Sequence, residues 1–247
     1  SDRLSFIKKK KEEKISLAFL SSDINGNHSI TFFLKTVLQK YDKSKFKVYL
    51  ISNSNEDDET TSFFKSLVDE FFNINNLSDH EAITYIRKKK ISILIDLMGL
   101  TSTNRISLFK SRMSPIQVSW LGYCNTTGID NMDYLLADRN TIKAHEKDLY
   151  SENIIYLPNI WNCHSGLKFT RIKNPAPFKK NNHITFGSFN NFNKINEDVV
   201  KVWSQILKEV DNSKLILKSS ISMQTNILRD LFKKHKSNNS VFFVNKK

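Results

Sequence analysis

The sequence predicts an α/β protein built from two Rossmann-like lobes, each a doubly wound parallel sheet. Two observations lead to this class. Short apolar runs alternate along the chain with amphipathic stretches of helical period, which favours strand–helix–strand units. One of these runs, ISILIDLMG at 91–99, is apolar without interruption, as expected for a strand buried on both faces of a parallel sheet.

The length of the chain and a break in its pattern indicate two lobes. Its 247 residues exceed the usual size of one domain, and the alternation stops at a lysine-rich segment with Pro175 and Pro177 and then begins again. Three strands are expected after that break, fewer than a complete doubly wound lobe contains, so we expect a truncated second lobe and a fragment of a longer protein. The expected parts are a basic tail at 1–14, a first lobe at 15–167, a linker at 168–182 and the first part of a second lobe at 183–247.

Each element follows from its hydrophobic period. In the first lobe we expect strands at 15–20, 45–52, 91–99, 115–122, 132–138 and 153–158, and helices at 29–41, 61–72 and 79–89. The last helix begins after Ser78 with Glu81 three residues on, which is the form of a capping box. In the second lobe we expect strands at 184–189, 214–220 and 241–244, and helices at 196–210 and 222–235.

The composition argues against several classes of protein. No apolar run approaches the roughly 20 residues of a membrane span, and the lysine-rich start lacks the apolar segment of a signal peptide. Cys124 and Cys163 form neither a disulfide framework nor a zinc motif, so we expect a reducing, cytoplasmic setting. The net charge of +13 raises nucleic acid as a partner, but the lysines are scattered and the aromatic residues follow a core-facing period, which argues against it.

Ligands of open parallel sheets bind beyond the carboxyl ends of the strands, which selects four loops. They are SSDINGNH, MGLTSTN, WLGYCNTTG and FGSFNNFNK. In the first, His28 could orient or accept a proton near neutral pH, although a lone loop histidine is more often a cap or a surface residue. In the third, Thr126 and Thr127 could bind ligand hydroxyls, or the loop could be an ordinary tight turn.

The fourth loop combines the amides of Asn190 and Asn191 with one cation, Lys194, just before the helix expected at 196–210. A helix N-terminus and an ammonium group together suit a phosphate that gains negative charge as a bond breaks. An Asn-rich turn with a surface lysine is the alternative, and from these residues alone the more frequent one. The sequence has no Walker loop and no Asp-x-Asp, which argues against a metal-held nucleotide diphosphate.

Five segments, in order along the chain, resemble the catalytic region of the O-linked N-acetylglucosamine transferase family, above all its bacterial SPINDLY-type members. They are FLSSDINGNHSI, ILIDLMGLT, SPIQVSWLGYCNTTGIDNMDYLLAD, YSENIIYLP and FGSFNNFNKIN…VWSQILKEVDNSKLIL. The resemblance covers about residues 15–245. Its most specific parts are PIQVSWLGY…TTG…MDY and the F-N-N-x-x-K loop.

The resemblance implies a GT-B fold, in which two Rossmann-like lobes face a cleft for a nucleotide-sugar donor and a polypeptide acceptor. It implies transfer of N-acetylglucosamine from UDP-GlcNAc to protein Ser and Thr hydroxyls, with inversion at the sugar carbon and without a metal or other cofactor. We expect upstream tetratricopeptide repeats in the full-length protein and an inactive fragment here. GDP-fucose or UDP-glucose as donor, a non-protein acceptor, and a non-catalytic basic nucleic-acid-binding or scaffold protein stay open as alternatives.

The resemblance also assigns site residues. Lys194 matches the family lysine that neutralises the leaving diphosphate, and His28 matches a histidine close to the reacting centre; these are the catalytic assignments. Asn191, beside Asn190, falls where the family has an amide that contacts the base. The other implied donor-binding residues, which line the sugar site or belong to its Gly-x-Thr loop, are Thr101, Leu121 and Gly122.

The sequence departs from the family pattern in four places. Leu100 stands where the family often has His or Tyr, and Cys124-Asn125 replaces a frequent Pro-Gly. The first loop is one residue longer between Asp23 and His28 than usual, which loosens the assignment of His28. The later donor-lobe motif, a Thr-rich turn followed by an acidic residue, is absent from these 247 residues, so the base and the sugar of the donor stay open.

Overall fold

The structure, a computed structural model, describes residues 13–26, 28–166, 175–219 and 222–245. The chain divides into two compact units, Ser1–Lys168 and Phe169–Lys247. Most of the expected basic tail lies outside the described residues, as does the expected linker up to residue 174. The rest of that linker contains the short helix α4 (Pro177–Asn181), which has its proline at the favoured first position.

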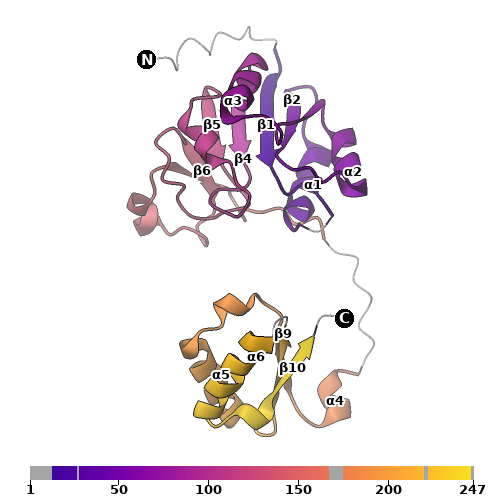
Figure 1. Cartoon of the computed structure of the whole chain (residues 1–247), viewed down its shortest axis with the longest axis vertical. Coiled ribbons are helices and arrows are strands. Elements are labelled where there is room, and N and C mark those ends of the chain that lie inside the picture. Colours follow the sequence, from indigo (N-terminus) through magenta and orange to yellow (C-terminus); the bar gives the residue numbers. More distant parts are fainter. Residues whose placement is uncertain (1–12, 27, 167–174, 220–221, 246–247) are drawn as a thin grey trace. The chain divides into compact units, whose positions relative to one another are not determined.

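The first unit contains a seven-stranded sheet in which every strand pair is parallel, in the order β3-β2-β1-β4-β5-β6-β7 (Figure 1). The strands are β1 (Ile15–Ser21), β2 (Phe46–Ser52), β3 (Glu70–Asn73), β4 (Ile93–Asp96), β5 (Ile116–Ser119), β6 (Tyr134–Ala137) and β7 (Asn153–Tyr156). The parallel α/β class predicted from the alternating pattern is therefore confirmed.

Helices cover both faces of this sheet. Helices α1 (Ile30–Lys40) and α2 (Glu59–Leu67) pack in one hydrophobic cluster, which takes Phe19 and Leu50 from the strands. Helix α3 (Asp79–Lys88) and the 3-10 helix η2 (Ile106–Lys110) pack in another, which takes the neighbouring strand residues Leu20 and Ile51. Successive residues of β1 and β2 thus enter opposite clusters, which is why these two inner strands are largely apolar. A second 3-10 helix, η3 (Ala144–Leu149), precedes β7.

The helix predicted at 61–72 is wrong in its second half. Helix α2 ends at Leu67, Val68 is extended with φ −110°, and Glu70–Asn73 form β3 beside β2. Phe71 packs with the α1–α2 cluster and Phe72 with the α3 cluster. The two phenylalanines therefore follow the two-residue period of a strand, and pairing with β2 overrides the helical pattern of the sequence.

The capping box predicted at the start of α3 is confirmed. The Ser78 hydroxyl accepts a hydrogen bond from the Glu81 N–H at 3.3 Å, and the Glu81 carboxylate accepts one from the Ser78 N–H at 2.8 Å. The bonds from the Ser78 hydroxyl and N–H hold the pKa of Glu81 below its usual value. Two N–H groups at the start of the helix are thereby satisfied.

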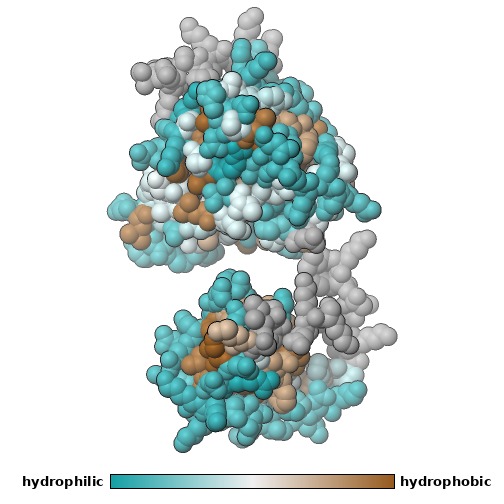
Figure 2. Space-filling view, viewed as in Figure 1, coloured by the Kyte–Doolittle hydropathy of each residue, from teal (hydrophilic) through white to brown (hydrophobic). Residues whose placement is uncertain are grey.

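The second unit contains a three-stranded parallel sheet in the order β10-β9-β8. Its elements are β8 (Thr185–Ser188), the 3-10 helix η4 (Phe192–Lys194), α5 (Glu197–Glu209), β9 (Lys214–Ser219), α6 (Ser222–Lys234), the 3-10 helix η5 (Asn238–Ser240) and β10 (Val241–Asn245). Residues of α5 and α6 share one cluster with Leu215, Leu217 and Val241. On alternate positions of β10, Phe242 and Val244 are exposed, and Figure 2 shows apolar residues on the visible surface of this unit.

The order of strands in the first sheet fixes where a ligand can bind. The chain runs outward from β1 to β2 and β3, returns to β4 beside β1, and then runs the other way to β7. At such a switch point the connections after neighbouring strands diverge and leave a crevice beyond the carboxyl ends. Three of the four loops selected from the sequence follow β1, β4 and β5, which are adjacent. Among the described residues, no helix is long and apolar enough to cross a membrane.

Candidate functional site

The loops after β1 and β4 are tied together at the switch point. The Ser22 N–H donates to the sulfur of Met98 at 3.1 Å, and the hydroxyls of Ser22 and Thr103 lie 2.8 Å apart. Because these bonds link residues about 80 positions apart in the chain, the two loops form one surface at the carboxyl end of the sheet.

Asp96, the last residue of β4, shapes the second loop. Its side chain is buried and accepts hydrogen bonds from the Gly99 N–H at 2.6 Å and the Met98 N–H at 3.3 Å. Burial raises the pKa of Asp96 to about 7, although the two N–H bonds act in the opposite direction. Sequence reasoning missed this residue, and the available signal was a single acid at the end of an apolar strand.

The turn that Asp96 holds presents Leu100 and Thr101. Leu100, which stands where the family often has a polar or aromatic side chain, is 49% exposed. The Thr101 hydroxyl donates to the Met98 carbonyl oxygen at 2.8 Å, so its hydrogen is used within the loop and its oxygen is what a ligand could bind. The sequence-predicted Thr101 thus lies on the loop expected for it.

The third loop begins with a strained turn. Leu121 is buried with φ +76°, and the Gly122 N–H donates to the Trp120 carbonyl oxygen at 3.0 Å. A hydrogen bond between residues two apart, around a central residue with positive φ, defines the rare and strained form of γ-turn. Such a backbone costs about 1–3 kcal/mol and persists only where its surroundings hold it.

Glycines lock the second and third loops together. A Cβ on Gly122 would lie 1.9 Å from the Leu97 carbonyl oxygen, and a Cβ on Gly99 would lie 2.4 Å from the Cβ of Tyr123. Gly99 also has φ +56°. Only glycine permits these approaches, so the backbone at Leu121 and Gly122, predicted to line the site, is part of a close-packed pair of loops.

The end of the third loop is held by a carboxylate that sequence reasoning missed. Glu152 is buried and accepts hydrogen bonds from the Thr127 N–H at 2.7 Å, from the Thr127 hydroxyl, and from the Thr126 hydroxyl at 2.9 Å. Of the two interpretations left open by the sequence, the structure supports the internal turn. No local pattern marks Glu152, since its partners lie 25 and 26 residues earlier in the chain.

His28 lies on the first loop, one residue before the N-cap of α1, Ser29. Its Nδ1 accepts a hydrogen bond from the Ile30 N–H at 3.3 Å, and its carbonyl oxygen accepts one from the Thr31 hydroxyl at 2.8 Å. Its Nε2 lies 3.8 Å from an Asp23 carboxylate oxygen, and 46% of its side chain is exposed. With Nδ1 accepting from the Ile30 N–H, a neutral ring carries its proton on Nε2, the nitrogen nearer Asp23.

The fourth loop lies in the second unit. The Asn191 side chain accepts from the Asn193 N–H at 3.0 Å and caps η4, and the Asn190 side chain accepts from the Asn191 N–H at 2.8 Å. Both amide oxygens thus shape the turn, which leaves their NH₂ groups as the donors a ligand could meet. Lys194 ends η4 with an exposed side chain, and it forms no ion pair within the described part of the chain.

The N-terminus of α5 is less open to an anion than the sequence suggests. The Asn196 side chain accepts from the Val199 N–H at 3.0 Å, and Glu197 and Asp198 occupy the first helical turn. These carboxylates interact with the positive end of the helix themselves. Attraction for a phosphate at this loop therefore rests on the Lys194 ammonium more than on the helix.

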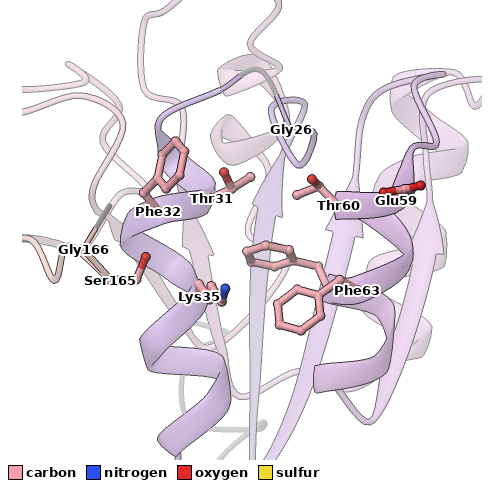
Figure 3. A pocket seen from close by; sticks show the side chains of 10 residues that line it. Gly26, Thr31, Phe32, Lys35, Glu59, Thr60, Phe63, Ser165 and Gly166 are labelled. Carbon is pink, nitrogen blue, oxygen red and sulfur yellow. The ribbon is translucent and has the colours of Figure 1, made fainter. Parts of the chain in front are cut away.

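A groove of about 670 Å³ opens between α1 and α2 (Figure 3). Thr31 and Lys35 of α1 face Thr60 and Phe63 of α2 across it, with Gly26 of the first loop at one end. The Lys35 Nζ lies 5.1 Å from the centre of the Phe63 ring. The residues that line the groove do not include His28 or the predicted residues of the second and third loops.

The segment 157–166 returns from β7 toward α1. Asp138 accepts from the Trp161 N–H at 2.7 Å, and the Trp120 indole N–H donates to the Trp161 carbonyl oxygen at 2.7 Å. Farther on, the Ser165 N–H donates to the Phe32 carbonyl oxygen at 2.7 Å. Burial acts to raise the pKa of Asp138, but the N–H groups that it accepts from outweigh burial and hold the pKa below its usual value.

Within the described ranges, no group of three or more His, Cys, Asp or Glu side chains is arranged to hold a metal ion. Cys124 and Cys163 are both free and exposed. The loops that carry His28, Thr101, Leu121 and Gly122 thus follow three adjacent strands of the first unit. It places Asn190, Asn191 and Lys194 on one loop of the second unit.

Comparison with known proteins identifies the family that the sequence resembles and the fold expected for it. The model of the family described as Glycosyl transferase family 41 matches residues 3–169. A protein of Solanum lycopersicum, named a probable UDP-N-acetylglucosamine–peptide N-acetylglucosaminyltransferase SPINDLY, is 32% identical over 211 residues, 84% of this chain and 23% of its own length. One of the same name from Eustoma exaltatum subsp. russellianum is 35% identical over 196 residues, 78% of this chain and 21% of its own.

A solved structure of an O-GlcNAc transferase mutant from Thermobaculum terrenum superposes with a TM-score of 0.88 and 24% identity, covering 96% of this chain and 45% of that one. This likeness confirms the two Rossmann-like lobes expected from the sequence. The chain spans just over a fifth of the length of the curated relatives it matches. On the family match over most of its first unit and on relatives more than 30% identical, the chain belongs to glycosyl transferase family 41.

Proposed function

We propose that the full-length protein transfers N-acetylglucosamine from UDP-GlcNAc to Ser or Thr hydroxyls of proteins. The observation that carries the proposal is that the loops resembling the family interlock at the switch point of the first sheet, where ligands of such sheets bind. Relatives named for transfer from UDP-N-acetylglucosamine to peptides support both the donor and the acceptor.

In the proposed reaction the acceptor hydroxyl oxygen attacks C1 of the sugar from the face opposite the diphosphate. The bond from C1 to the diphosphate oxygen breaks, and UDP leaves with the bonding electron pair, so C1 is inverted. Lys194 neutralises the charge that develops on the leaving group, without a metal ion. Its exposed ammonium, free of ion pairs within the described part of the chain, suits this role.

His28 is proposed to act beside C1. Because its Nδ1 is occupied by the Ile30 N–H, it first serves as an Nε2–H donor that orients the acceptor or sugar oxygen. Once Nδ1 leaves the Ile30 N–H, it is the free basic nitrogen of the ring and takes the proton of the acceptor hydroxyl; the charged ring then has the Asp23 carboxylate 3.8 Å from its Nε2. Thr101, Leu121 and Gly122 are proposed to line the sugar.

Asn190 and Asn191 are proposed to contact the base through their NH₂ groups. We also propose a cytoplasmic setting, supported by the two exposed cysteines that form no disulfide. Upstream tetratricopeptide repeats that present the polypeptide acceptor are part of the proposal as well, on the resemblance alone.

The test is turnover of the full-length protein with UDP-GlcNAc, UDP-glucose and GDP-fucose, for the wild type, Lys194→Ala and the control Lys201→Ala. Lys201 is an exposed lysine of α5, seven residues farther along the chain. We expect UDP-GlcNAc to be the preferred donor and Lys194→Ala to lower kcat by about 10²–10³-fold, as for the loss of one donor to a developing oxyanion. Near-normal turnover of Lys194→Ala would refute the role of Lys194, and preference for GDP-fucose would replace the proposed donor.

A further inference from the structure

Glu152 is a buried carboxylate that neither family resemblance nor sequence pattern assigns to the site. It immediately precedes β7, and its three hydrogen bonds all go to the turn at Thr126 and Thr127. Strand β6 lies between β7 and β5 in the sheet. Glu152 lies at the amino end of β7, beside the start of β6, where the Asn153 N–H donates to the Asp133 carbonyl oxygen at 3.0 Å. The carboxylate therefore holds the connection from β5 to β6 from the neighbouring strand.

The loop has a second anchor at its start. There Gly122 lies against the Leu97 carbonyl and Tyr123 lies over Gly99, with Leu121 in its strained conformation. Only Cys124 and Asn125, both exposed, lie between this anchor and the turn bound by Glu152. Because so few residues join the two anchors, we expect movement at Thr126 to displace Leu121 and Gly122.

We propose that Glu152 is a positioning residue for the sugar part of the donor. By fixing the end of the loop at 121–128, it keeps the backbone of Leu121 and Gly122 in the strained conformation that a bound sugar would meet. A strained backbone relaxes when one of its supports is removed, and groups displaced by about 1 Å lose most of their contribution to a site. This inference rests on the proposed function, since it takes the third loop as the edge of the sugar site.

Two probes, UDP and UDP-GlcNAc, distinguish a role in sugar binding from a role in stability. UDP alone lacks the sugar, so the state of the third loop should not affect its binding. UDP-GlcNAc carries the sugar, so its affinity should depend on Glu152. A role confined to folding stability would not distinguish UDP from UDP-GlcNAc.

The experiment measures the Kd of each probe by calorimetry on the full-length protein, for the wild type, Glu152→Ala, Glu152→Gln and the control Glu146→Gln. Glu146 accepts from the Lys143 N–H at 2.7 Å on an exposed turn of the same unit and makes none of the bonds that hold Thr126 and Thr127. Hydrogen exchange of residues 126–128 reports whether the loop is released.

We expect Glu152→Ala to weaken the binding of UDP-GlcNAc by about tenfold or more, while the affinity for UDP changes little. The amides of residues 126–128 should exchange faster. Glu152→Gln retains an acceptor for the Thr127 N–H and should restore most of the affinity, and Glu146→Gln should match the wild type. If Glu152→Ala does not fold, Thr126→Val removes one bond to the carboxylate and should give a smaller loss of the same kind.

Unchanged affinity for UDP-GlcNAc in a variant whose 126–128 amides exchange faster would overturn the inference. So would an equal loss for UDP and UDP-GlcNAc. Failure of the proposed function would be seen in the wild type instead, as the absence of binding to either probe, and the role of Glu152 as a donor-positioning residue would fall with it.

Discussion

The Leu97 carbonyl oxygen occupies the place where a side chain on Gly122 would begin, 1.9 Å from the position of its Cβ. Leu97 follows β4 and Gly122 follows β5, so this contact joins the loops of two adjacent strands backbone to backbone. The two loops can therefore lie this close only because residue 122 has no Cβ.

Gly122→Ala should push the two loops apart. We expect it to lower the free energy of unfolding of the first unit by about 1–3 kcal/mol, the usual cost of overpacking, because the opposing atoms are backbone and cannot turn aside. Urea unfolding in a Trp203→Phe background measures this, since both remaining tryptophans, Trp120 and Trp161, belong to the first unit.

Gly166→Ala is the matched control for that experiment. Gly166 has φ +82°, but no atom lies within 4 Å of the place that a Cβ would take, so the substitution costs only left-handed strain, about 1–2 kcal/mol. It should leave donor binding unchanged, whereas Gly122→Ala should abolish it. Full donor affinity in Gly122→Ala would contradict the close packing of the two loops.

Asp96→Asn should remove a pH dependence of stability. The pKa of Asp96 is raised to about 7 in the folded protein by burial, so the folded state holds a proton that the unfolded state releases near pH 4. The contribution of Asp96 to stability is present at low pH and is lost as the pH rises toward 7, at up to about 1.4 kcal/mol per pH unit.

The difference in unfolding free energy between wild type and Asp96→Asn should therefore fall between pH 5 and 7 and then level off. Comparing the two proteins at each pH cancels the titration of the histidines, which both contain. A difference that stays constant from pH 5 to 8 would show that Asp96 is ionised throughout.

Asp138→Asn should release the chain around Trp161, beyond Leu157. The amide oxygen can still accept from the Asn140 and Thr141 N–H groups at 2.8 Å, but the new NH₂ group cannot accept from the Trp161 N–H. We expect a loss of about 1.5–3 kcal/mol, typical of a hydrogen bond to a charged group, and faster exchange of the Trp161 amide.

The Leu157 amide is the internal reference for that exchange measurement. It donates to the Ala137 carbonyl oxygen at 2.8 Å within the sheet and should exchange as in the wild type. Equal acceleration at Leu157 and Trp161 would point to global unfolding in place of local release.

Leu100→His should change donor binding without changing stability. Leu100 is 49% exposed, and substitutions at such positions usually alter the free energy of unfolding by less than about 0.5 kcal/mol. A histidine there would restore a polar side chain at the rim of the second loop, so we expect tighter UDP-GlcNAc binding by calorimetry. Unchanged affinity would show that this position does not reach the donor.

The parts of the fold that follow a local period were predictable from sequence, and those that depend on distant partners were not. The strands predicted at 15–20 and 91–99 and the capping box at Ser78 follow from neighbouring residues. The structure confirms all three, although the second strand is shorter than predicted, Ile93–Asp96. Strand β3 was missed because Phe71 and Phe72 continue the apolar pattern of α2, and only pairing with β2 reveals the strand.

The candidate site shows the same division. The rule that ligands bind beyond strand ends selected the loops of His28, Thr101 and Gly122, and the sheet order places those loops side by side. The carboxylates that hold the loops, Asp96 and Glu152, were not foreseen, because a buried acid is recognised by its burial and its partners, which the sequence does not display.

The interlocked glycines have a consequence for how this edge of the molecule can be mapped. Where a pocket wall consists of peptide groups, replacing side chains one by one with alanine removes nothing from the wall, and a conventional scan would report it as empty. The informative substitutions there add atoms. A methyl group at position 99 or 122 would clash with the neighbouring loop and so reveal the wall.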